Sequence, residues 1–247
     1  MIVANTMVDT GTSSQPVEAR GVVASGLSSF EGIEEPTVIY HPGTKSFTSD
    51  PFANITDVGG GTIRFTLRYQ PEWWDGDRAT GNRDRQRAEV KGLGAHQKTG
   101  ETFIYAMEWR TSAQFVGSER FCHIFQLKAT DGDNGAPLVT LSIKEGTELG
   151  QLQLWSGHEG ERAARQFKWK PGGWHRTEIV ITTSVEQMGK ALASIDGDAL
   201  EGLSDVAVYR PRASDYRPKW GLYRGTAKGL HPGEDWVEHR NVSARRG

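Results

Sequence analysis

A segment near the C-terminus combines a cation, a glycine and a phenol at alternate positions. Residues 216–224 (Tyr-Arg-Pro-Lys-Trp-Gly-Leu-Tyr-Arg) are typical of a β-strand whose proline lies near its start. Because alternate side chains of a strand share a face, Lys219, Gly221 and Tyr223 point the same way. This face is too polar for a hydrophobic core. It is typical either of an ordinary exposed strand or of a cleft floor, where the glycine lets a substrate approach the backbone.

Residues 85–91 have a similar two-faced pattern. Arg85, Arg87, Glu89 and Lys91 share one face, and the residues between them are mostly small or apolar. Neighbouring polar groups on such a face lie about 6.6 Å apart. A solvated outer face of a sheet explains this pattern, and so does a groove that holds an acidic polymer.

Residues 121–128 form a third segment of this kind. Regular alternation places Gln126 and Lys128 on one face and His123 on the opposite face. All three segments are rich in hydrogen-bond donors and poor in carboxylates. Together they favour a groove for an acidic polymer over three unrelated exposed faces.

In this order, the three segments resemble the signature strands of jelly-roll polysaccharide lyases, a group that includes alginate lyases, heparin lyase I and glucuronan lyases. Residues 87–91 (Arg-Ala-Glu-Val-Lys) are similar to the Arg-Ser/Thr-Glu-Leu/Val-Arg pattern of alginate lyases, and Lys219 and Tyr223 match their Lys-x-Gly-x-Tyr strand. Lys128 stands where alginate lyases carry the histidine of Gln-Ile-His. This departure, and the ending Gly-Leu-Tyr-Arg at Arg224, make the chain more similar to the glucuronan lyase and heparin lyase branch. The motifs cover only about 20 residues, but their order spans most of the chain.

The resemblance implies an all-β jelly-roll sandwich of two antiparallel sheets with a concave substrate groove. It also implies a polysaccharide lyase that cleaves a uronate-containing polymer, of the glucuronan or alginate type, by β-elimination with unsaturated products. The residues that would bind the substrate are Arg85, Glu89, His123, Lys128, Lys219 and Arg224. Alternation turns Arg224 to the face opposite Tyr223.

The chemistry of such an elimination assigns roles to the polar residues. The C5 proton of a uronate is a very weak acid because its removal adds a second negative charge, so preorganised donors must neutralise the carboxylate. Arg87, a planar forked donor, and Gln126, a neutral amide donor, suit that role. Tyr223 can protonate the leaving oxygen and, as a phenolate, can accept the C5 proton. Lys219 lies about 13 Å along the strand from Tyr223, so we assign it to the carboxylate of a neighbouring sugar.

The sequence leaves the identity of the base open. A free tyrosine has a pKa of about 10, so Tyr223 needs a nearby cation such as Arg87 or Lys128 to act as the base. His96 is an alternative, because it follows the Arg87 strand by a short loop and could reach over the cleft, and His123 is another. If the C5 hydrogen and O4 leave from the same side, as in glucuronate or mannuronate, the tyrosine alone suffices. Elimination from opposite sides requires a second group.

The composition is compatible with one all-β domain. The chain has 247 residues and a mass of 27.3 kDa, and its 30 Gly, 10 Pro and short alternating runs favour a sandwich over helices. We predict a polar tail or edge segment at residues 1–20 and a single domain at residues 21–247. Asp196-Gly197 predicts a hairpin turn, and residues 73–82 a loop. Strands are expected at residues 62–69, 84–91, 102–111, 121–129, 138–144, 151–156, 165–169, 174–184, 206–209, 216–224 and 235–243.

Charge and cysteine content limit the partners. The formal net charge of −2 and the pI of about 6.4 argue against a nucleic-acid ligand, so a polyanion must be held by a local cluster of cations. No run approaches the length of about 18 apolar residues that a membrane span needs. Cys122 is the single cysteine, which excludes an intramolecular disulfide, and its position in a strand predicts a buried, inert thiol. We expect a monomer that requires no cofactor and no catalytic metal.

Several alternatives stay open at this point. The acidic turn at residues 131–135 (Asp-Gly-Asp-Asn-Gly) could hold a structural calcium ion, as related glucuronan lyases do, or be a plain hairpin loop. The N-terminus has no basic or long apolar stretch, so the protein is cytoplasmic or a signal peptide has been removed; an enzyme that degrades polysaccharides favours a secreted or periplasmic location. The rival functions are a non-catalytic carbohydrate-binding module and a glycoside hydrolase. A hydrolase needs two carboxylates, and the groove pattern offers only Glu89.

Overall fold

The computed structural model describes most of the chain beyond the predicted polar tail. The tail at residues 1–20 lies outside the described residues, and for residues 22–23 and 160–164 only the backbone is described. The described ranges are residues 22–23, 27–76, 84–94, 96–145, 148–157, 160–226 and 230–247.

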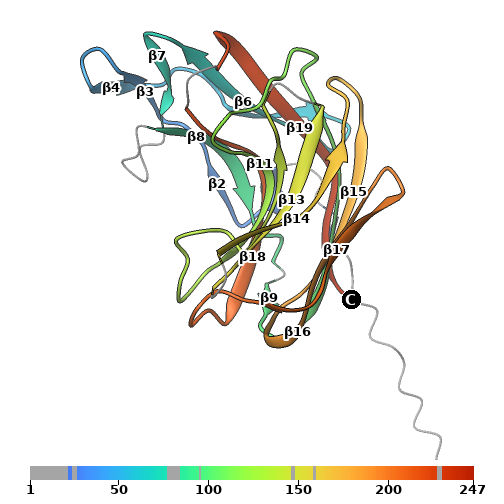
Figure 1. The fold of residues 1–247 in the computed structure, drawn as a ribbon. Helices are drawn as coiled ribbons and strands as arrows, with labels where there is room; N and C mark the ends of the chain where they lie inside the picture. Colours follow the sequence, from blue (N-terminus) through green and yellow to red (C-terminus); the bar gives the residue numbers. More distant parts are fainter. Residues whose placement is uncertain are drawn as a thin grey trace, which may run out of the picture.

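Two antiparallel sheets pack face to face in a jelly-roll sandwich, as predicted (Figure 1). The described part of the first sheet has eleven strands, and that of the second has eight. The order in the first sheet is β17 (Asp198–Val208), β16 (Ser184–Ile195), β15 (His175–Thr182), β10 (Thr102–Thr111), β19 (Gly233–Arg246), β6 (Thr62–Gln70), β7 (Trp73–Gly76), β3 (Val38–His41) and β4 (Ser46–Ser49), with β1 (Val22–Val23) on β19 and β5 (Ile55–Gly59) on β6. The order in the second sheet is β14 (Gly160–Lys168), β13 (Leu149–Ser156), β12 (Val139–Ile143), β11 (Cys122–Ala129), β18 (Asp215–Gly225), β8 (Arg85–Lys91) and β2 (Gly32–Glu34), with β9 (Gln97–Lys98) on β18. A short 3-10 helix, η1 (Leu27–Ser29), precedes β2.

The core lies between the two sheets and is formed by alternate residues of their strands. On β10, buried and partly exposed residues alternate over the whole strand, and Tyr105 is one of the buried ones. Its ring contacts Phe125 of the second sheet at a centroid distance of 5.5 Å, and Phe125 in turn contacts Trp220 at 5.9 Å. Burial of each such side chain stabilises the fold by roughly 1.5–3 kcal/mol. The inward faces of β11 and β18 are therefore fixed by packing, and their other faces point outward.

Most of the predicted strands are present, with small differences at their ends. The Asp196-Gly197 turn is confirmed between β16 and β17, with φ of +54° and +92°. The predicted loop at residues 73–82 is wrong in its first part, because β7 pairs there with β3 and β6, and residues 77–83 lie outside the described residues. No strand was predicted for β1, β2, β3, β4, β5, β9 or most of β16, and only residues 206–209 were predicted for β17. Several of these strands are short or have few apolar alternations.

The single cysteine lies in the interior, as its position in a strand predicts. Cys122 is a free, fully buried cysteine, and burial raises the pKa of its thiol to about 12. The thiol is therefore inert, as predicted. In the described ranges, no helix has the length and apolar character that a membrane span requires.

Gly221 on β18 is required by the neighbouring strand rather than by a substrate. Its φ is +142°, a conformation that L side chains rarely adopt. A Cβ atom built at this position would lie 2.2 Å from the carbonyl oxygen of Ala88 and 2.8 Å from the Cα of Glu89, both on β8. The interpretation of this glycine as a gap for a substrate is therefore wrong.

We expect the substitution Gly221→Ala to lower the free energy of unfolding by roughly 2–5 kcal/mol, because backbone strain and a collision with β8 add together. Denaturant unfolding measures this loss. Gly233→Ala is the matched control, since Gly233 has φ +136° but no atom within 4 Å of its added Cβ. Gly233→Ala introduces backbone strain without a collision. Equal losses of unfolding free energy in the two variants would therefore contradict the predicted collision at Gly221.

Candidate active site

The outward face of the second sheet brings four polar side chains into one row across four strands. Tyr223 on β18 is directly opposite Arg87 on β8 and opposite His123 on β11. His123 is in turn opposite Ser142 on β12. The antiparallel register thus places side chains from distant parts of the sequence beside one another.

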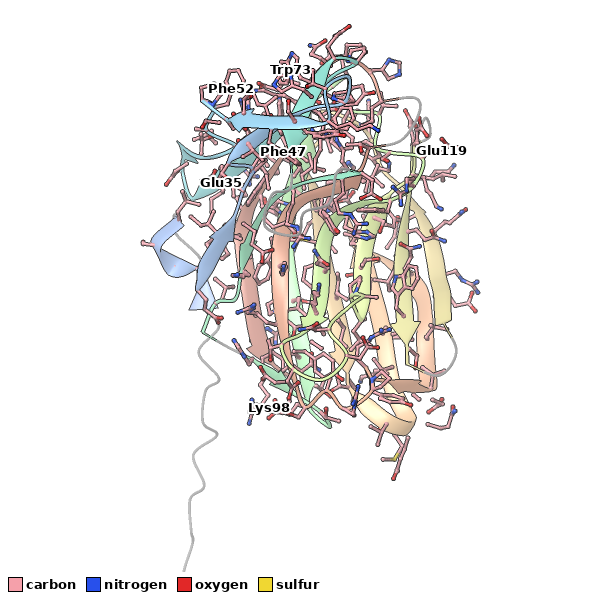
Figure 2. The ribbon with its side chains drawn as sticks, turned by 90° about the vertical axis from the view of Figure 1, so that its left-hand side faces the viewer. Glu35, Phe47, Phe52, Trp73, Lys98 and Glu119 are labelled. Atoms are coloured by element: carbon pink, nitrogen blue, oxygen red, sulfur yellow. The ribbon has the colours of Figure 1, made fainter. Side chains whose placement is uncertain are left out.

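A cleft with a volume of about 390 Å³ opens on this face. Five residues predicted for the site line it, namely Arg85, His123, Gln126, Lys128 and Tyr223, together with Ser142, Gln153, Trp155 and Glu119. Figure 2 shows Glu119 near one end of the sandwich and Lys98 at the opposite end. Among the described residues that line the cleft, Glu119 is the one carboxylate. The described lining is thus rich in donors and poor in carboxylates, as the sequence predicts.

Tyr223 is held between two arginines. Its hydroxyl oxygen accepts a hydrogen bond of 3.1 Å from Nη1 of Arg85, and the guanidinium of Arg87 lies 4.3 Å from the centre of its ring. The ring of Phe121 also packs against the ring of Tyr223, with centroids 4.9 Å apart. The cation that touches the phenol oxygen is Arg85, and not Arg87 or Lys128 as expected. A guanidinium in this position stabilises negative charge on the oxygen.

His123 lies on the same face as Gln126, so the prediction of opposite faces is wrong. The register of β11 shifts between His123 and Phe125 relative to both β12 and β18. At this irregularity Ile124 and Phe125 are adjacent in sequence, yet both are buried in the core. A β-bulge of this kind changes the phase of the alternation. The signal in the sequence was the pair of consecutive apolar residues, which breaks strict alternation.

His123 is a neutral histidine with a defined partner. Burial lowers the pKa of its imidazole to about 3. The Nδ1 atom lies 2.8 Å from Oγ of Ser142. Only 6% of the residue is exposed, so its orientation is set by the protein rather than by bulk water.

Gln126 is bound to a buried carboxylate beneath the cleft. Its Nε2 donates a hydrogen bond of 2.5 Å to Oε1 of Glu89, which is only 2% exposed. The other oxygen of Glu89 lies 3.8 Å from Nε of Arg87 and 3.9 Å from Nζ of Lys219. Glu89 is therefore an internal counterion of the cations, whereas the sequence analysis listed it as substrate-binding.

Glu34 on β2 is a carboxylate that the sequence analysis missed. It accepts hydrogen bonds from Arg87 (2.9 Å), from Lys91 (3.2 Å) and from Lys219. Burial alone would raise the pKa of Glu34, but Lys219 and Arg87 outweigh it and hold the pKa well below its usual range. β2 has only three residues, too few for a recognisable pattern, so Glu34 could not be assigned to this face.

Lys219 and Lys128 differ in their access to the cleft. Lys219 is only 4% exposed and its ammonium faces Glu34, so it does not present an open subsite for a second sugar. Lys128 is half-buried and lines the cleft. Burial, with the nearby charges of Lys219 and Arg87, lowers its pKa. Lys128 is thus the better placed of the two lysines to meet a substrate.

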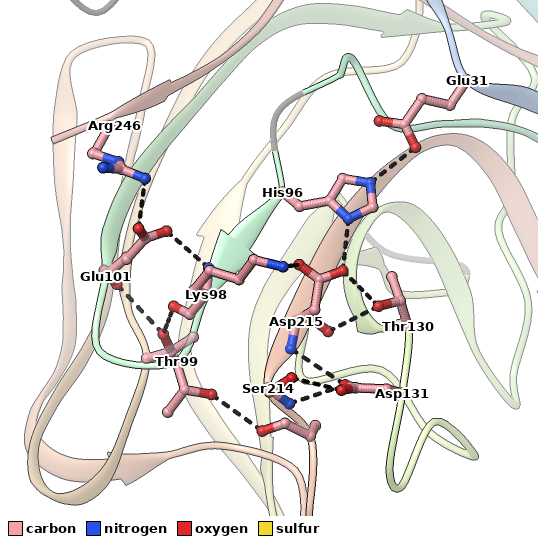
Figure 3. A network of polar contacts seen from close by, with 12 residues as sticks. Glu31, His96, Lys98, Thr99, Glu101, Thr130, Asp131, Ser214, Asp215 and Arg246 are labelled. Carbon is pink, nitrogen blue, oxygen red and sulfur yellow. Dashed lines mark hydrogen bonds and ion pairs between the residues drawn. The ribbon is translucent and has the colours of Figure 1, made fainter.

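His96 lies far from Tyr223, at the other end of β18. Its Nδ1 is 2.6 Å from Oδ2 of Asp215, and its Nε2 is 3.0 Å from Oε2 of Glu31 (Figure 3). Asp215 is eight residues from Tyr223, or roughly 26 Å along an extended strand. Burial alone would lower the pKa of His96, but its hydrogen bonds to Glu31 and Asp215 outweigh burial and raise the pKa. The structure therefore does not bring His96 to the cleft.

Arg224 is a core residue, and its listing among the substrate-binding residues is wrong. Its side chain is fully buried. The guanidinium donates to Oε1 of Gln86 at 2.9 Å and forms an ion pair with Asp235. Regular alternation on β18 turns it away from Tyr223 and into the space between the sheets.

The acidic turn at residues 131–135 has both of its carboxylates engaged by protein donors. Asp131 accepts hydrogen bonds from the backbone N–H and the hydroxyl of Ser214, and Asp133 pairs with Arg210. Within the described ranges, no group of three or more His, Cys, Asp and Glu residues could hold a metal ion. Calcium binding at this turn stays a prediction, and nothing in the chemistry of the cleft depends on it.

The comparisons with known proteins agree with this geometry. The family model described as Polysaccharide lyase matches residues 36–238. No curated protein sequence matches the chain. The endo-β-1,4-glucuronan lyase from the fungus Trichoderma reesei superposes with a TM-score of 0.66 at 19% identity, covering 91% of this chain and 94% of that one. The family 7 alginate lyase A1-II′ gives a TM-score of 0.59 at 15% identity, covering 85% and 94%. At these identities the similarity shows a shared fold.

The raised pKa of His96 predicts a pH-dependent stability. Protonated His96 pairs with two carboxylates, so its contribution is complete below the unfolded-state pKa of about 6.5 and is lost as the pH rises through the folded-state pKa. We expect the stability of the wild type to fall relative to His96→Gln over this window, by roughly 1 kcal/mol for a partly exposed pair. Denaturant titrations from about pH 6 to 9 measure the difference.

Two other histidines do not interfere with this measurement. Burial lowers the pKa values of His123 and His239 to about 3, so they affect stability only below the unfolded-state pKa. A difference between wild type and His96→Gln that stays constant across the titration would contradict the prediction.

Proposed function

The chain belongs to the polysaccharide lyase family, and from this premise we propose that it cleaves a uronate-containing anionic polysaccharide by β-elimination. Glucuronan-type polymers are the leading substrates, and alginate-type polymers come second. One observation carries the proposal. His123 and Tyr223 lie on adjacent strands, with ring centroids 5.9 Å apart, and both line a cleft that also contains Gln126 and Lys128.

The substrate carboxylate is held by Gln126 and Lys128 in this proposal. Gln126 gives one amide N–H to Glu89 and has a second N–H for the substrate. Lys128 supplies a positive charge at the cleft wall. Arg87, which the sequence analysis assigned to the carboxylate, lies behind Tyr223 and is paired with Glu34, so its contribution is the positive potential beneath the site.

His123 is the proposed base, in place of His96. Its Nε2 takes the C5 proton, the electrons of the C5–H bond form the C4–C5 double bond, and the C4–O4 bond breaks. Tyr223 gives its proton to O4, and Arg85 stabilises the phenolate that remains. Solvent then returns the proton from His123 to Tyr223. Burial lowers the pKa of His123, and the substrate carboxylate raises it because a nearby negative charge favours the imidazolium.

The position of His123 and Tyr223 on the same sheet also supports a preference among uronates. His123 and Tyr223 both rise from one sheet, so they reach the sugar from the same side. Removal of the C5 hydrogen and O4 from one side suits glucuronate and mannuronate units. Guluronate units, whose C5 hydrogen lies on the opposite side from O4, would need a base above the sugar.

The substrate class also bears on location and assembly. Uronate polymers of this kind lie outside the cell, which supports a secreted or periplasmic enzyme. The expectation of a monomer remains a prediction, as does the absence of a cofactor requirement.

We expect the protein to release unsaturated oligosaccharides from glucuronan or alginate and to leave neutral glucans intact. The new C4–C5 double bond is conjugated with the carboxylate, so the products absorb ultraviolet light. Absorbance and mass spectrometry in isotopically labelled water measure the outcome. Saturated products that contain an oxygen atom from water would show hydrolysis, and binding without cleavage would show a carbohydrate-binding module; either result overturns the proposal.

The two reacting side chains should each be necessary. We expect Tyr223→Phe and His123→Gln to lower kcat by about 10²–10⁴-fold, because each removes a positioned acid or base. Tyr69→Phe and His239→Gln are the matched controls: they change a hydroxyl of the first sheet and a second buried neutral histidine, neither of which lines the cleft. Both controls should retain activity within about threefold. Normal turnover by His123→Gln would remove His123 as the base.

A further inference from the structure

We propose that Ser142 and Gln153 form a positioning relay that fixes the proton of His123 on Nδ1 and directs its Nε2 lone pair to the cleft. The relay rests on the proposed function only for its role in turnover. The state of the imidazole itself can be measured without a substrate. Neither Ser142 nor Gln153 was singled out by the sequence, because they belong to a different hairpin of the sheet, β12 and β13.

The hydrogen bonds around Ser142 make its oxygen an acceptor toward His123. The Oε1 atom of Gln153 is a carbonyl oxygen and can only accept. It lies 2.9 Å from Oγ of Ser142 and 3.1 Å from Oγ1 of Thr140. Both hydroxyls can donate to Gln153, and Ser142 Oγ also lies 3.2 Å from Oγ1 of Thr140, a second acceptor for its proton. Whichever of the two oxygens takes the single proton of Ser142, the Ser142 oxygen acts as an acceptor toward His123, 2.8 Å away.

An acceptor at this position decides the tautomer. A neutral imidazole carries its proton on one nitrogen and a lone pair on the other. Because Oγ of Ser142 accepts, Nδ1 is the protonated nitrogen and Nε2 is the basic one. A general base needs this lone pair on the side that meets the substrate.

Burial makes the arrangement robust. Thr140, Ser142 and Gln153 are each at most 8% exposed. Bulk water does not replace a missing partner at such a site, and an unmade hydrogen bond to a buried N–H is costly. Removal of the acceptor at Ser142 should therefore move the proton to Nε2, where it can point into the cleft.

The tautomer can be read directly by nuclear magnetic resonance. Long-range ¹H–¹⁵N correlation of histidine-labelled protein distinguishes protonated from unprotonated ring nitrogens, and His123→Gln identifies the signals of His123. We expect protonated Nδ1 in the wild type and in Gln153→Glu, which keeps an acceptor oxygen. We expect a shift to protonated Nε2 in Ser142→Ala and a smaller shift in Gln153→Leu, where Oγ1 of Thr140 remains as an acceptor for the Ser142 hydroxyl. Protonated Nε2 in the wild type, or an unchanged tautomer in both Ser142→Ala and Gln153→Leu, would overturn the relay.

Kinetics then test what the relay does for turnover. We expect Ser142→Ala to lower kcat by about 10–100-fold with little change in KM, as for other residues that orient a reacting imidazole. Ser142→Thr keeps the hydroxyl and should restore most of the loss. Ser156→Ala is the matched control, because Ser156 is a buried serine of β13 that is not among the described residues lining the cleft. Equal losses in Ser156→Ala and Ser142→Ala would contradict the relay.

The two proposals fail in different ways. If the wild type gives no unsaturated product on any uronate polymer, the proposed function fails, and the tautomer of His123 still decides the relay. If the wild type is a lyase but Ser142→Ala has normal kcat and an unchanged tautomer, only the relay fails.

Discussion

Charge compensation beneath the cleft is the constraint on which the rest of the site depends. Lys91 and Lys219 are directly opposite each other on β8 and β18, and like charges at such positions destabilise a sheet. Glu34 accepts hydrogen bonds from both lysines, and Glu89 lies behind Gln126 and close to Lys219. Without these two carboxylates, the cations could not be packed on one sheet face. Glu34 and Glu89 are thus committed to holding cations.

This commitment explains why the site suits elimination better than hydrolysis. A glycosidase uses a pair of carboxyl groups that face the scissile bond. Here Glu34 is paired with Arg87 and Lys91, and Glu89 lies within 4 Å of cationic nitrogens of Arg87 and Lys219. Apart from the carboxylate of Glu119, the described cleft lining offers a sugar an imidazole, a phenol, amides, hydroxyls and cations. That set can neutralise a uronate carboxylate and move one proton off C5 and another onto O4.

The sequence predicted the parts of the site that follow strict alternation. The three strands, the sandwich and the cleft positions of Tyr223, Gln126 and Lys128 all follow from a period of two on β11 and β18. The same rule predicts that Arg224 points into the core. The prediction that Arg224 binds the substrate came from the motif resemblance instead. Motif resemblance and alternation disagreed there, and packing between the sheets decided the outcome.

The residues that the sequence misplaced depend on events that alternation does not encode. His123 reaches the cleft through a register shift, Glu34 through a three-residue edge strand, and His96 is held away by two carboxylates from distant segments. The positions of Glu34 and His96 depend on contacts with distant segments, and the bulge at His123 has one sign in the sequence, the consecutive apolar residues Ile124 and Phe125. The register shift in β11 has the largest chemical consequence, because it brings an imidazole beside Tyr223 without disturbing Phe125 in the core. With a regular β11, the same histidine would lie between the sheets, and the proposed mechanism would need Tyr223 as both base and acid.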